Sequence, residues 1–176
     1  NFYLHRKWTN RAEAAGYGAL IVTLDASIQA PSVSALRAGF QMPADLRPAN
    51  LAGHPPTPQS EPLADGASRI FQGLLANAPT WDDLDWLAAR TALPLVVKGV
   101  LHPDDAHRLR QRGTAAVVVS NHGGRTVDGA LSSLAALPAI RRATGPDFPV
   151  LLDSGIRSGN DVFKALALGA DAVMVG

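Results

Sequence analysis

Residues 115–130 read AAVVVSNHGGRTVDGA and contain the pattern that decides the fold. Ala115 to Val119 is a run of small and β-branched apolar residues, typical of a strand buried on both faces of a parallel sheet. The run ends at a polar segment in which two glycines separate His122 from Arg125. A buried strand that passes directly into reactive side chains predicts an α/β protein with its site at the carboxyl ends of the strands.

Similar apolar runs recur along the chain, with helical patterns between them. Thr80 and Ser158 have the spacing of capping boxes, Pro103 fits a first helical turn, and Gly113 and Gly169 are expected to close helices. Repeated βα units predict either a doubly wound sheet or a (β/α) barrel. The expected strands are Phe2 to His5, Ala19 to Leu24, Leu95 to Lys98, Ala115 to Val119, Val150 to Leu152 and Ala172 to Val175.

The segment 26–79 interrupts this alternation of strands and helices, because its sequence shows no regular hydrophobic pattern. It contains Pro31, Pro43, Pro48, Pro55, Pro56, Pro58 and Pro62. So long a loop inside a compact domain is usually functional or disordered. We therefore expect a mobile loop within one domain that spans residues 1–176, with a short helix around Ser68 to Ala76.

The composition excludes several classes of protein. A chain of 176 residues with 47% hydrophobic residues can bury a core of single-domain size. A net charge of +1 without a long basic run argues against a nucleic-acid partner. Cysteine is absent, which excludes a disulfide framework and a thiolate metal site, and we predict no metal. No apolar run reaches the roughly 18 residues of a membrane-spanning helix, and no signal peptide is visible, so we expect a cytoplasmic protein.

Polar residues gather at the ends of the expected strands. A single histidine there is more often structural, but six strand ends that all carry polar groups argue for a common site. These residues are Tyr3, Thr23 with Asp25, Lys98, Ser120 with His122 and Arg125, Asp153 with Arg157, and Gly176.

Four of these groups indicate specific chemistry. The two glycines after His122 allow a sharp turn and a close approach to a flat ligand, although an ordinary βα turn would have the same residues. In LLDSGIRSGNDV (151–162), Arg157 and a helix start near Ser158 predict a phosphate site, against a surface salt bridge. Lys98 ends a buried strand and needs an anionic partner, which is either a reduced ring or a carboxylate. Asp25 would hold a protonated His122. The alternative for Lys98 and Asp25 is an ion pair with each other or with other structural partners.

Four segments together resemble the family of FMN-dependent 2-hydroxy acid oxidases and dehydrogenases, which includes glycolate oxidase, lactate oxidase, L-lactate dehydrogenase and mandelate dehydrogenase. They are VTLDA (22–26), VVKGV (96–100), VVVSNHGGRTVDG (117–129) and LLDSGIRSGNDVFKALALGADAVMVG (151–176). The resemblance implies a TIM (β/α)8 barrel, of which this chain would hold strands 3 to 8 with a long irregular loop after strand 4. The chain is therefore expected to be a fragment that lacks the first two strands and the closing helix.

The resemblance also implies roles for individual residues. His122 would be the active-site base, Arg125 the anchor of the substrate carboxylate, and Tyr3 a second contact to the substrate. Asp25 would stabilise the protonated form of His122. Lys98 would lie beside the flavin ring, and Asn1 departs from the glutamine that is usual at its position. The residues implied to bind FMN are Asn1, Thr23, Lys98, Ser120, Asp153, Gly155, Arg157 and Gly176.

The implied reaction is the FMN-dependent oxidation of a small L-2-hydroxy acid to the 2-oxo acid, with electrons passing as a hydride or through a carbanion. Oxygen, a quinone or a cytochrome would accept the electrons, and the full-length protein is expected to be a homo-oligomer, with peripheral membrane association left open. Two alternatives remain at this stage. One is another FMN- or phosphate-binding barrel, such as type 2 isopentenyl diphosphate isomerase or inosine monophosphate dehydrogenase. The other is a truncated domain that binds flavin without catalysis.

Overall fold

The computed structural model describes residues 2–26, 32–46, 49, 64–68, 75 and 78–176, with the backbone alone for 2–7. The chain divides into two compact units, residues 1–28 with 79–176 and residues 29–78. Every strand of the described residues belongs to the first unit. The second unit contains α2 (Val33–Arg37), which begins where the side chain of Ser32 accepts a hydrogen bond from the Ala35 amide.

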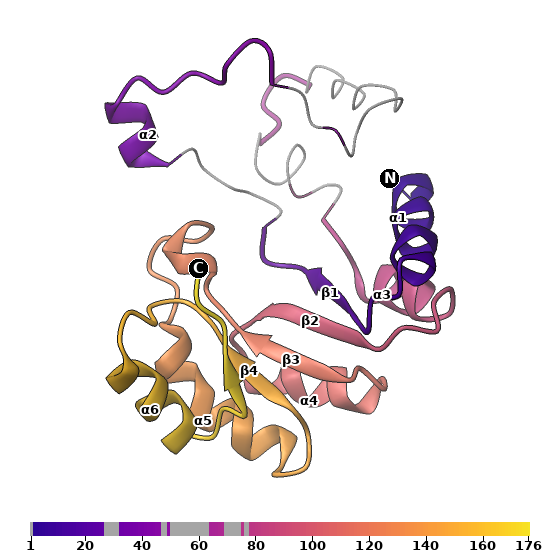
Figure 1. Cartoon of the computed structure of the whole chain (residues 1–176), viewed down its shortest axis with the longest axis vertical. Helices are drawn as coiled ribbons and strands as arrows, with labels where there is room; N and C mark the ends of the chain where they lie inside the picture. Colours follow the sequence, from indigo (N-terminus) through magenta and orange to yellow (C-terminus); the bar gives the residue numbers. More distant parts are fainter. Residues whose placement is uncertain (1, 27–31, 47–48, 50–63, 69–74, 76–77) are drawn as a thin grey trace. The chain divides into compact units, whose positions relative to one another are not determined.

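Five parallel strands form one sheet in the order β1-β2-β3-β4-β5 (Figure 1). The register pairs Thr23 with Lys98 and Val119 with Leu152, so the carboxyl ends of the strands lie along one edge. All four residues of β3 are buried, as expected for a central parallel strand. The strands are β1 (Leu20–Thr23), β2 (Leu95–Val100), β3 (Ala116–Val119), β4 (Val150–Leu152) and β5 (Ala172–Val173). Five of the six expected strands are thereby confirmed, with small shifts at their ends.

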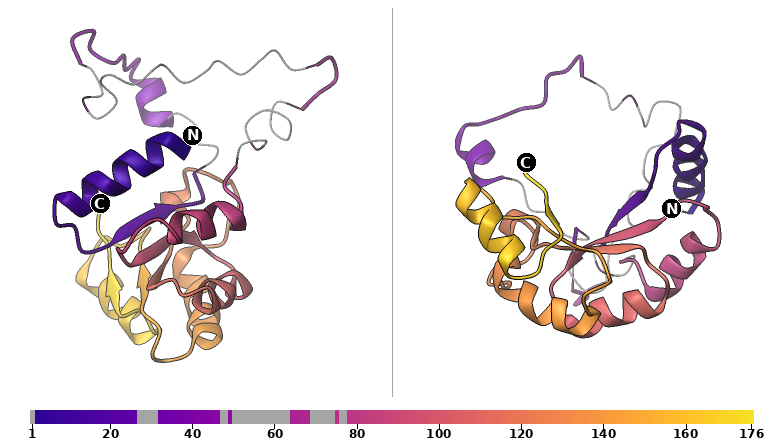
Figure 2. Two further views of the ribbon diagram at one scale, coloured as in Figure 1. Left: turned by 90° about the vertical axis from the view of Figure 1, so that its right-hand side faces the viewer. Right: turned by 60° about the horizontal axis from the view of Figure 1, so that its bottom comes forward.

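Four helices lie along one face of this sheet (Figure 2). They are α3 (Trp81–Ala88), α4 (Pro103–Gln111), α5 (Ser133–Thr144) and α6 (Gly159–Ala167). Their starts follow the sequence signals, since Thr80 forms a reciprocal capping box with Asp83, and Ser158 caps α6. Gly113 and Gly169, with φ of 80° and 107°, follow the ends of α4 and α6. None of the helices in the described ranges is long and apolar enough to cross a lipid bilayer.

The core fills the space between the sheet and these helices. Val97, Val117 and Val119 from the sheet and Leu137 and Ile140 from α5 are almost completely buried. Burial of each such side chain stabilises the fold by about 1.5–3 kcal/mol. The strands are therefore held firmly along their length, which fixes the polar residues at their carboxyl ends.

Arg141 connects the end of α5 to the turns that precede β4 and β5. Its guanidinium donates to the carbonyl oxygens of Gly145 (2.8 Å), Phe148 (2.7 Å) and Gly169 (2.6 Å) and to the Asp171 carboxylate (2.6 Å). The side chain is only 16% exposed. Arg141 therefore stabilises the amino-terminal side of the sheet, opposite the carboxyl ends of the strands.

The expected strand at Phe2 to His5 is wrong, because these residues begin α1 (Phe2–Ala14). A run of four apolar and aromatic residues has no periodicity that separates a strand from a first helical turn. The residues that follow, including Arg11, Ala12 and Glu13, favour a helix, and the helix extends back through the run. The described sheet thus has five strands rather than the six expected, and Tyr3 does not end a strand.

The expectations for residues 26–79 are largely untested. The helix α2 was not predicted within that segment. Most of the helix expected around Ser68 to Ala76 lies outside the described residues, and the predicted mobility of the segment stays a prediction.

Candidate functional site

The segment after β3 forms a left-handed turn, η4 (His122–Gly124). The φ angles of His122, Gly123 and Gly124 are 57°, 68° and 72°. Glycine adopts such angles without strain, so the predicted sharp turn is confirmed. Histidine adopts them rarely, and a side chain held in this conformation marks a candidate functional position.

His122 is paired with Asp25, which follows β1. The Nδ1 atom of the imidazole lies 3.0 Å from Oδ1 of the carboxylate, and the two side chains are 22% and 14% exposed. The carboxylate favours the tautomer with hydrogen on Nδ1, which leaves the lone pair on Nε2. The second oxygen of Asp25, Oδ2, is buried and has no hydrogen-bond partner among the described residues.

A bulge in β2 allows Asp25 to reach this position. The register with β3 shifts between Lys98 and Val100, so Gly99 is the extra residue of the bulge. The φ of Gly99 is 101°, and a Cβ built on it would lie 2.6 Å from both Cβ and Cγ of Asp25. Only glycine leaves room here for the Asp25 side chain.

Lys98 finds its anionic partner in Asp153, at the end of β4. Its Nζ lies 2.9 Å from Oδ2 of Asp153 and donates to Oγ of Ser120 at 3.1 Å. Burial alone would raise the pKa of Asp153, but hydrogen bonds from Ser120, Lys98 and Ser154 outweigh it and lower that pKa below its ordinary value of 3.8. Asp153 is therefore ionised, and the ion-pair alternative for Lys98 holds with Asp153 as the carboxylate.

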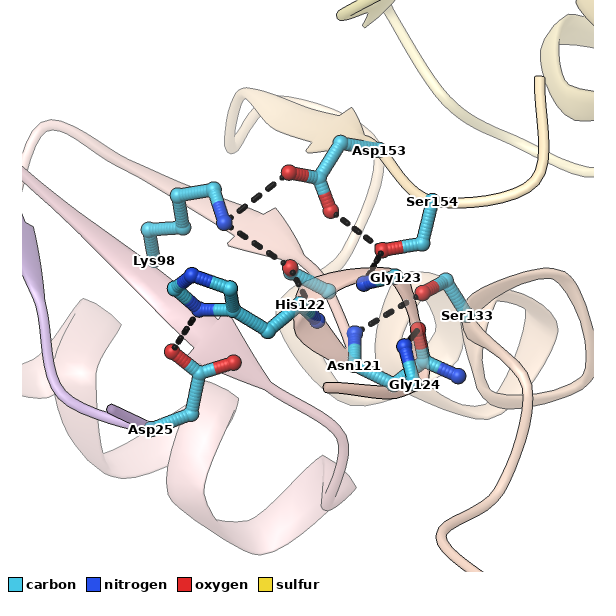
Figure 3. Close-up of polar contacts among 10 residues, drawn as sticks. Asp25, Lys98, Asn121, His122, Gly123, Gly124, Ser133, Asp153 and Ser154 are labelled. Carbon is cyan, nitrogen blue, oxygen red and sulfur yellow. Dashed lines mark hydrogen bonds and ion pairs between the residues drawn. The ribbon is translucent and has the colours of Figure 1, made fainter. Parts of the chain in front are cut away.

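Three residues that support the turn were not predicted from the sequence (Figure 3). Ser154 donates from Oγ to Oδ1 of Asp153 at 2.9 Å and accepts from the Gly123 amide at 2.9 Å. Ser133 accepts from the Asn121 amide, and the Asn121 side chain accepts from the Gly124 amide. The one signal for Ser154 is its place between a strand-ending aspartate and a glycine.

A cavity of about 630 Å³ opens at the carboxyl ends of β2, β3 and β4. It brings six of the predicted site residues together, and Asp25 and Ser120 join them through hydrogen bonds to His122 and Lys98. The lining residues are Lys98, His122, Gly123, Asp153, Ser154, Gly155, Ile156, Arg157, Met174, Val175 and Gly176.

Four predicted site residues are not brought into this cavity by the described structure. Thr23 ends β1 beside Lys98 and is exposed. Arg125 follows the left-handed turn, is exposed, and has no ion-pair partner in the described part of the chain. Tyr3 is described only as helical backbone, and Asn1 lies outside the described residues, so the roles expected for both stay predictions.

The start of α6 differs in part from the predicted phosphate site. Oδ2 of Asp161 accepts hydrogen bonds from the Ser158 hydroxyl at 2.9 Å and from the Arg157 amide at 3.1 Å, and these bonds lower the pKa of Asp161. Some donors at this helix end therefore already have an acidic partner. The guanidinium of Arg157 is exposed and has no ion-pair partner within the described residues.

Comparison with known proteins assigns the family. Residues 3–176 match the family described as FMN-dependent dehydrogenase. The chain belongs to this family. It is 61% identical to an L-lactate oxidase from Alicycliphilus denitrificans, over 94% of this chain and 45% of that protein. It is 42% identical to a 4-hydroxymandelate oxidase from Amycolatopsis orientalis, over 94% of this chain and 46% of that protein.

Solved structures agree with this assignment. The structure of mandelate oxidase with benzoyl-formic acid matches with a TM-score of 0.77 and 37% identity, over 97% of this chain and 44% of that one. Mandelate oxidase is a TIM barrel, so the five described strands form part of that barrel. The chain spans about half the length of the relatives it matches, 45% of one L-lactate oxidase and 48% of another, from a Nostoc species. The family match favours the 2-hydroxy acid oxidases over the isomerase and inosine monophosphate dehydrogenase alternatives.

The cavity residues fit the FMN group that the family name implies. Lys98 and Arg157 supply cations at separate points of the lining, as a flavin ring and a phosphate require. Asp153 supplies an ionised acceptor for hydroxyl groups. A Cβ built on Gly155 or Gly176 meets no atom within 4 Å, so the backbone at both glycines is open to a ligand.

Proposed function

We propose that the protein containing this chain uses FMN to oxidise a small L-2-hydroxy acid to the 2-oxo acid, with His122 as the base. The observation that carries the proposal is the His122–Asp25 pair at 3.0 Å on the wall of a cavity that also holds Lys98 and Asp153. The names of the relatives support lactate as the first substrate to test and oxygen as the electron acceptor.

Bound FMN would supply a two-electron acceptor. The residues of this chain would do the remaining work on the substrate. Nε2 of His122 takes a proton, and the carboxylate of Asp25 stabilises the resulting imidazolium. Arg125 binds the substrate carboxylate through two parallel hydrogen bonds, and Tyr3 adds a second contact. The left-handed backbone of His122, at φ 57°, and the contact with Asp25 hold the half-buried imidazole in one orientation.

The groups for the cofactor lie around the same cavity. Lys98 would contact the flavin ring, and Ser120, Asp153, Gly155, Arg157 and Gly176 would contact the ribityl and phosphate part, with Thr23 and Asn1 as further contacts. Lys98 is already neutralised in part by Asp153, so it would offer the ring a hydrogen-bonded cation rather than an isolated charge. A homo-oligomeric state and a cytoplasmic location stay predictions from the sequence.

His122→Gln tests the proposal in the FMN-loaded protein. A positioned general base typically contributes about 10²- to 10⁴-fold, so anaerobic reduction of the flavin by L-lactate should slow by that factor. FMN content should not change, and a carboxylate inhibitor should still perturb the flavin spectrum. His107→Gln is the matched control, because His107 is an exposed residue of α4 that contacts Ala143 and Gln111. Parental reduction rates in His122→Gln would refute the assigned base and leave His122 with a structural role.

A further inference from the structure

The polar contacts around His122 form a chain that the backbone between the His122 and Gly123 amides closes into a ring. Two serine hydroxyls accept from consecutive backbone amides, and both hydroxyls connect to one ion pair (Figure 3). The contacts in order are His122 N to Ser120 Oγ (3.0 Å), Ser120 Oγ to Lys98 Nζ (3.1 Å), Lys98 Nζ to Asp153 Oδ2 (2.9 Å), Asp153 Oδ1 to Ser154 Oγ (2.9 Å), and Ser154 Oγ to Gly123 N (2.9 Å). The left-handed turn that carries the imidazole is therefore fixed on both sides of His122.

Ser154 occupies a backbone conformation that does not suit it. Its φ is 73°, next to Gly155 at 80°. Glycine would adopt this conformation without strain, whereas serine has a Cβ that crowds the backbone. Serine is thus less favourable than glycine for the local backbone. Its one compensating feature is the hydroxyl that joins Asp153 to Gly123.

We propose that Ser154 is a positioning residue for the base. It holds the Gly123 amide, and through it the left-handed turn and the direction of the His122 ring. Ser154 does not touch the imidazole in the described structure, so it acts through the backbone alone. The inference rests on the proposed function, since it takes His122 as the base.

The position of Ser154 separates this role from a purely structural one. Ser154 lines the cavity rather than the core, and the Gly123 amide is exposed enough for water to replace a lost partner. Removal of the hydroxyl should therefore leave the fold intact and loosen the turn. A displacement of about 1 Å at a catalytic group can slow a reaction about 10²-fold, so partial loosening should slow the chemical step about 10- to 100-fold.

Three substitutions in the FMN-loaded protein separate the hydroxyl from the backbone strain. Ser154→Gly removes both, Ser154→Ala removes the hydroxyl and keeps the strain, and Ser154→Thr keeps the hydroxyl. We expect both hydroxyl-free variants to reduce FMN with L-lactate about 10- to 100-fold more slowly, with KM and FMN content unchanged. Ser154→Gly should show a denaturation midpoint at or above that of Ser154→Ala. Ser154→Thr should recover most of the rate.

Hydrogen exchange gives a readout that is independent of turnover. The peptide that contains Gly123 should exchange about 10-fold faster in Ser154→Gly, since its amide loses an acceptor. Ser132→Gly is the matched control, because Ser132 also accepts from a backbone amide but does so at the exposed start of α5. It should change neither the exchange at Gly123 nor the rate of reduction.

The outcomes distinguish this inference from the proposed function. Parental reduction and exchange in Ser154→Gly, with His122→Gln inactive, would overturn the positioning role alone. Loss of FMN from Ser154→Gly would also overturn it, by showing that the hydroxyl serves the cofactor through Asp153. If His122→Gln kept the parental rate, the proposed base would fail, and the role of Ser154 would fail with it, whatever the exchange at Gly123.

Discussion

Gly99→Ala is expected to disconnect Asp25 from His122 without removing either residue. A Cβ on residue 99 would lie 2.6 Å from Cβ and Cγ of Asp25, whereas carbon atoms in contact are normally about 3.5–4.0 Å apart. Relief of that overlap moves the Asp25 side chain by about 1 Å. The hydrogen bond to His122 would then lengthen from 3.0 Å to about 4 Å, beyond hydrogen-bond range.

The expected loss of rate follows from that hydrogen bond. A hydrogen bond to a charged group contributes about 1.5–3 kcal/mol, and loss of this amount from the protonated base slows the reaction about 10- to 100-fold. The alanine backbone at φ 101° adds an independent destabilisation of about 1–2 kcal/mol, which affects folding rather than chemistry.

The assay is anaerobic single-turnover reduction of the FMN-loaded protein by L-lactate, together with urea denaturation. Gly169→Ala is a close control, because Gly169 has a φ of 107° and its added Cβ would lie 2.7 Å from Cγ of Arg141, outside the site. Both variants should lose stability, and only Gly99→Ala should lose rate. Equal loss of stability with a parental rate in both variants would refute the argument that the bulge positions Asp25.

Three further predictions concern single residues. Arg125→Lys keeps the charge but loses the two-pronged hydrogen bonding, so KM for L-lactate should rise and turnover should fall with FMN retained; unchanged steady-state kinetics would place the substrate carboxylate elsewhere. Because the folded-state pKa of Asp153 lies below 3.8, its ionised form contributes stability that is complete above that pH and is lost as the pH falls through the folded-state value. Asp153→Asn should therefore weaken the acid dependence of unfolding below about pH 4 in the FMN-free protein, and an unaltered dependence would contradict this. Arg141→Ala should lower the free energy of unfolding by about 2–4 kcal/mol in urea titrations, while the rate per FMN-loaded molecule stays parental.

Most of the sheet could be predicted from the sequence because its strands are short, apolar and buried. The run at β3 is buried at every residue, and capping residues such as Thr80 and Ser158 mark the starts of the helices between the strands. The first segment could not be predicted in this way. Phe2 to His5 has the composition of a strand, but its helical conformation depends on the residues that follow it.

The residues of the candidate site at the strand ends could be predicted, but most of the contacts between them could not. Lys98 required an anionic partner on physical grounds, and the structure supplies Asp153. Asp25 and His122 are separated by 97 positions in the chain, and from the residues alone their pairing was one of two open alternatives, which the family resemblance then favoured. Ser154 and the bulge at Gly99 depend on φ angles and on strand register, which a single sequence does not encode as a pattern.

The left-handed turn limits substitutions of its two glycines through backbone torsion angles rather than through side-chain chemistry or volume. A Cβ built on Gly123 or Gly124 meets no other atom within 4 Å, so a side chain would fit in the available space. The torsion angles disfavour it nonetheless, since an L-residue is strained by about 1–2 kcal/mol where φ is 68° or 72°. A saturation library should therefore show these two positions as less tolerant than other exposed positions. A mirror-image alanine introduced by chemical synthesis would suit the same torsion angles, because the constraint there is handedness.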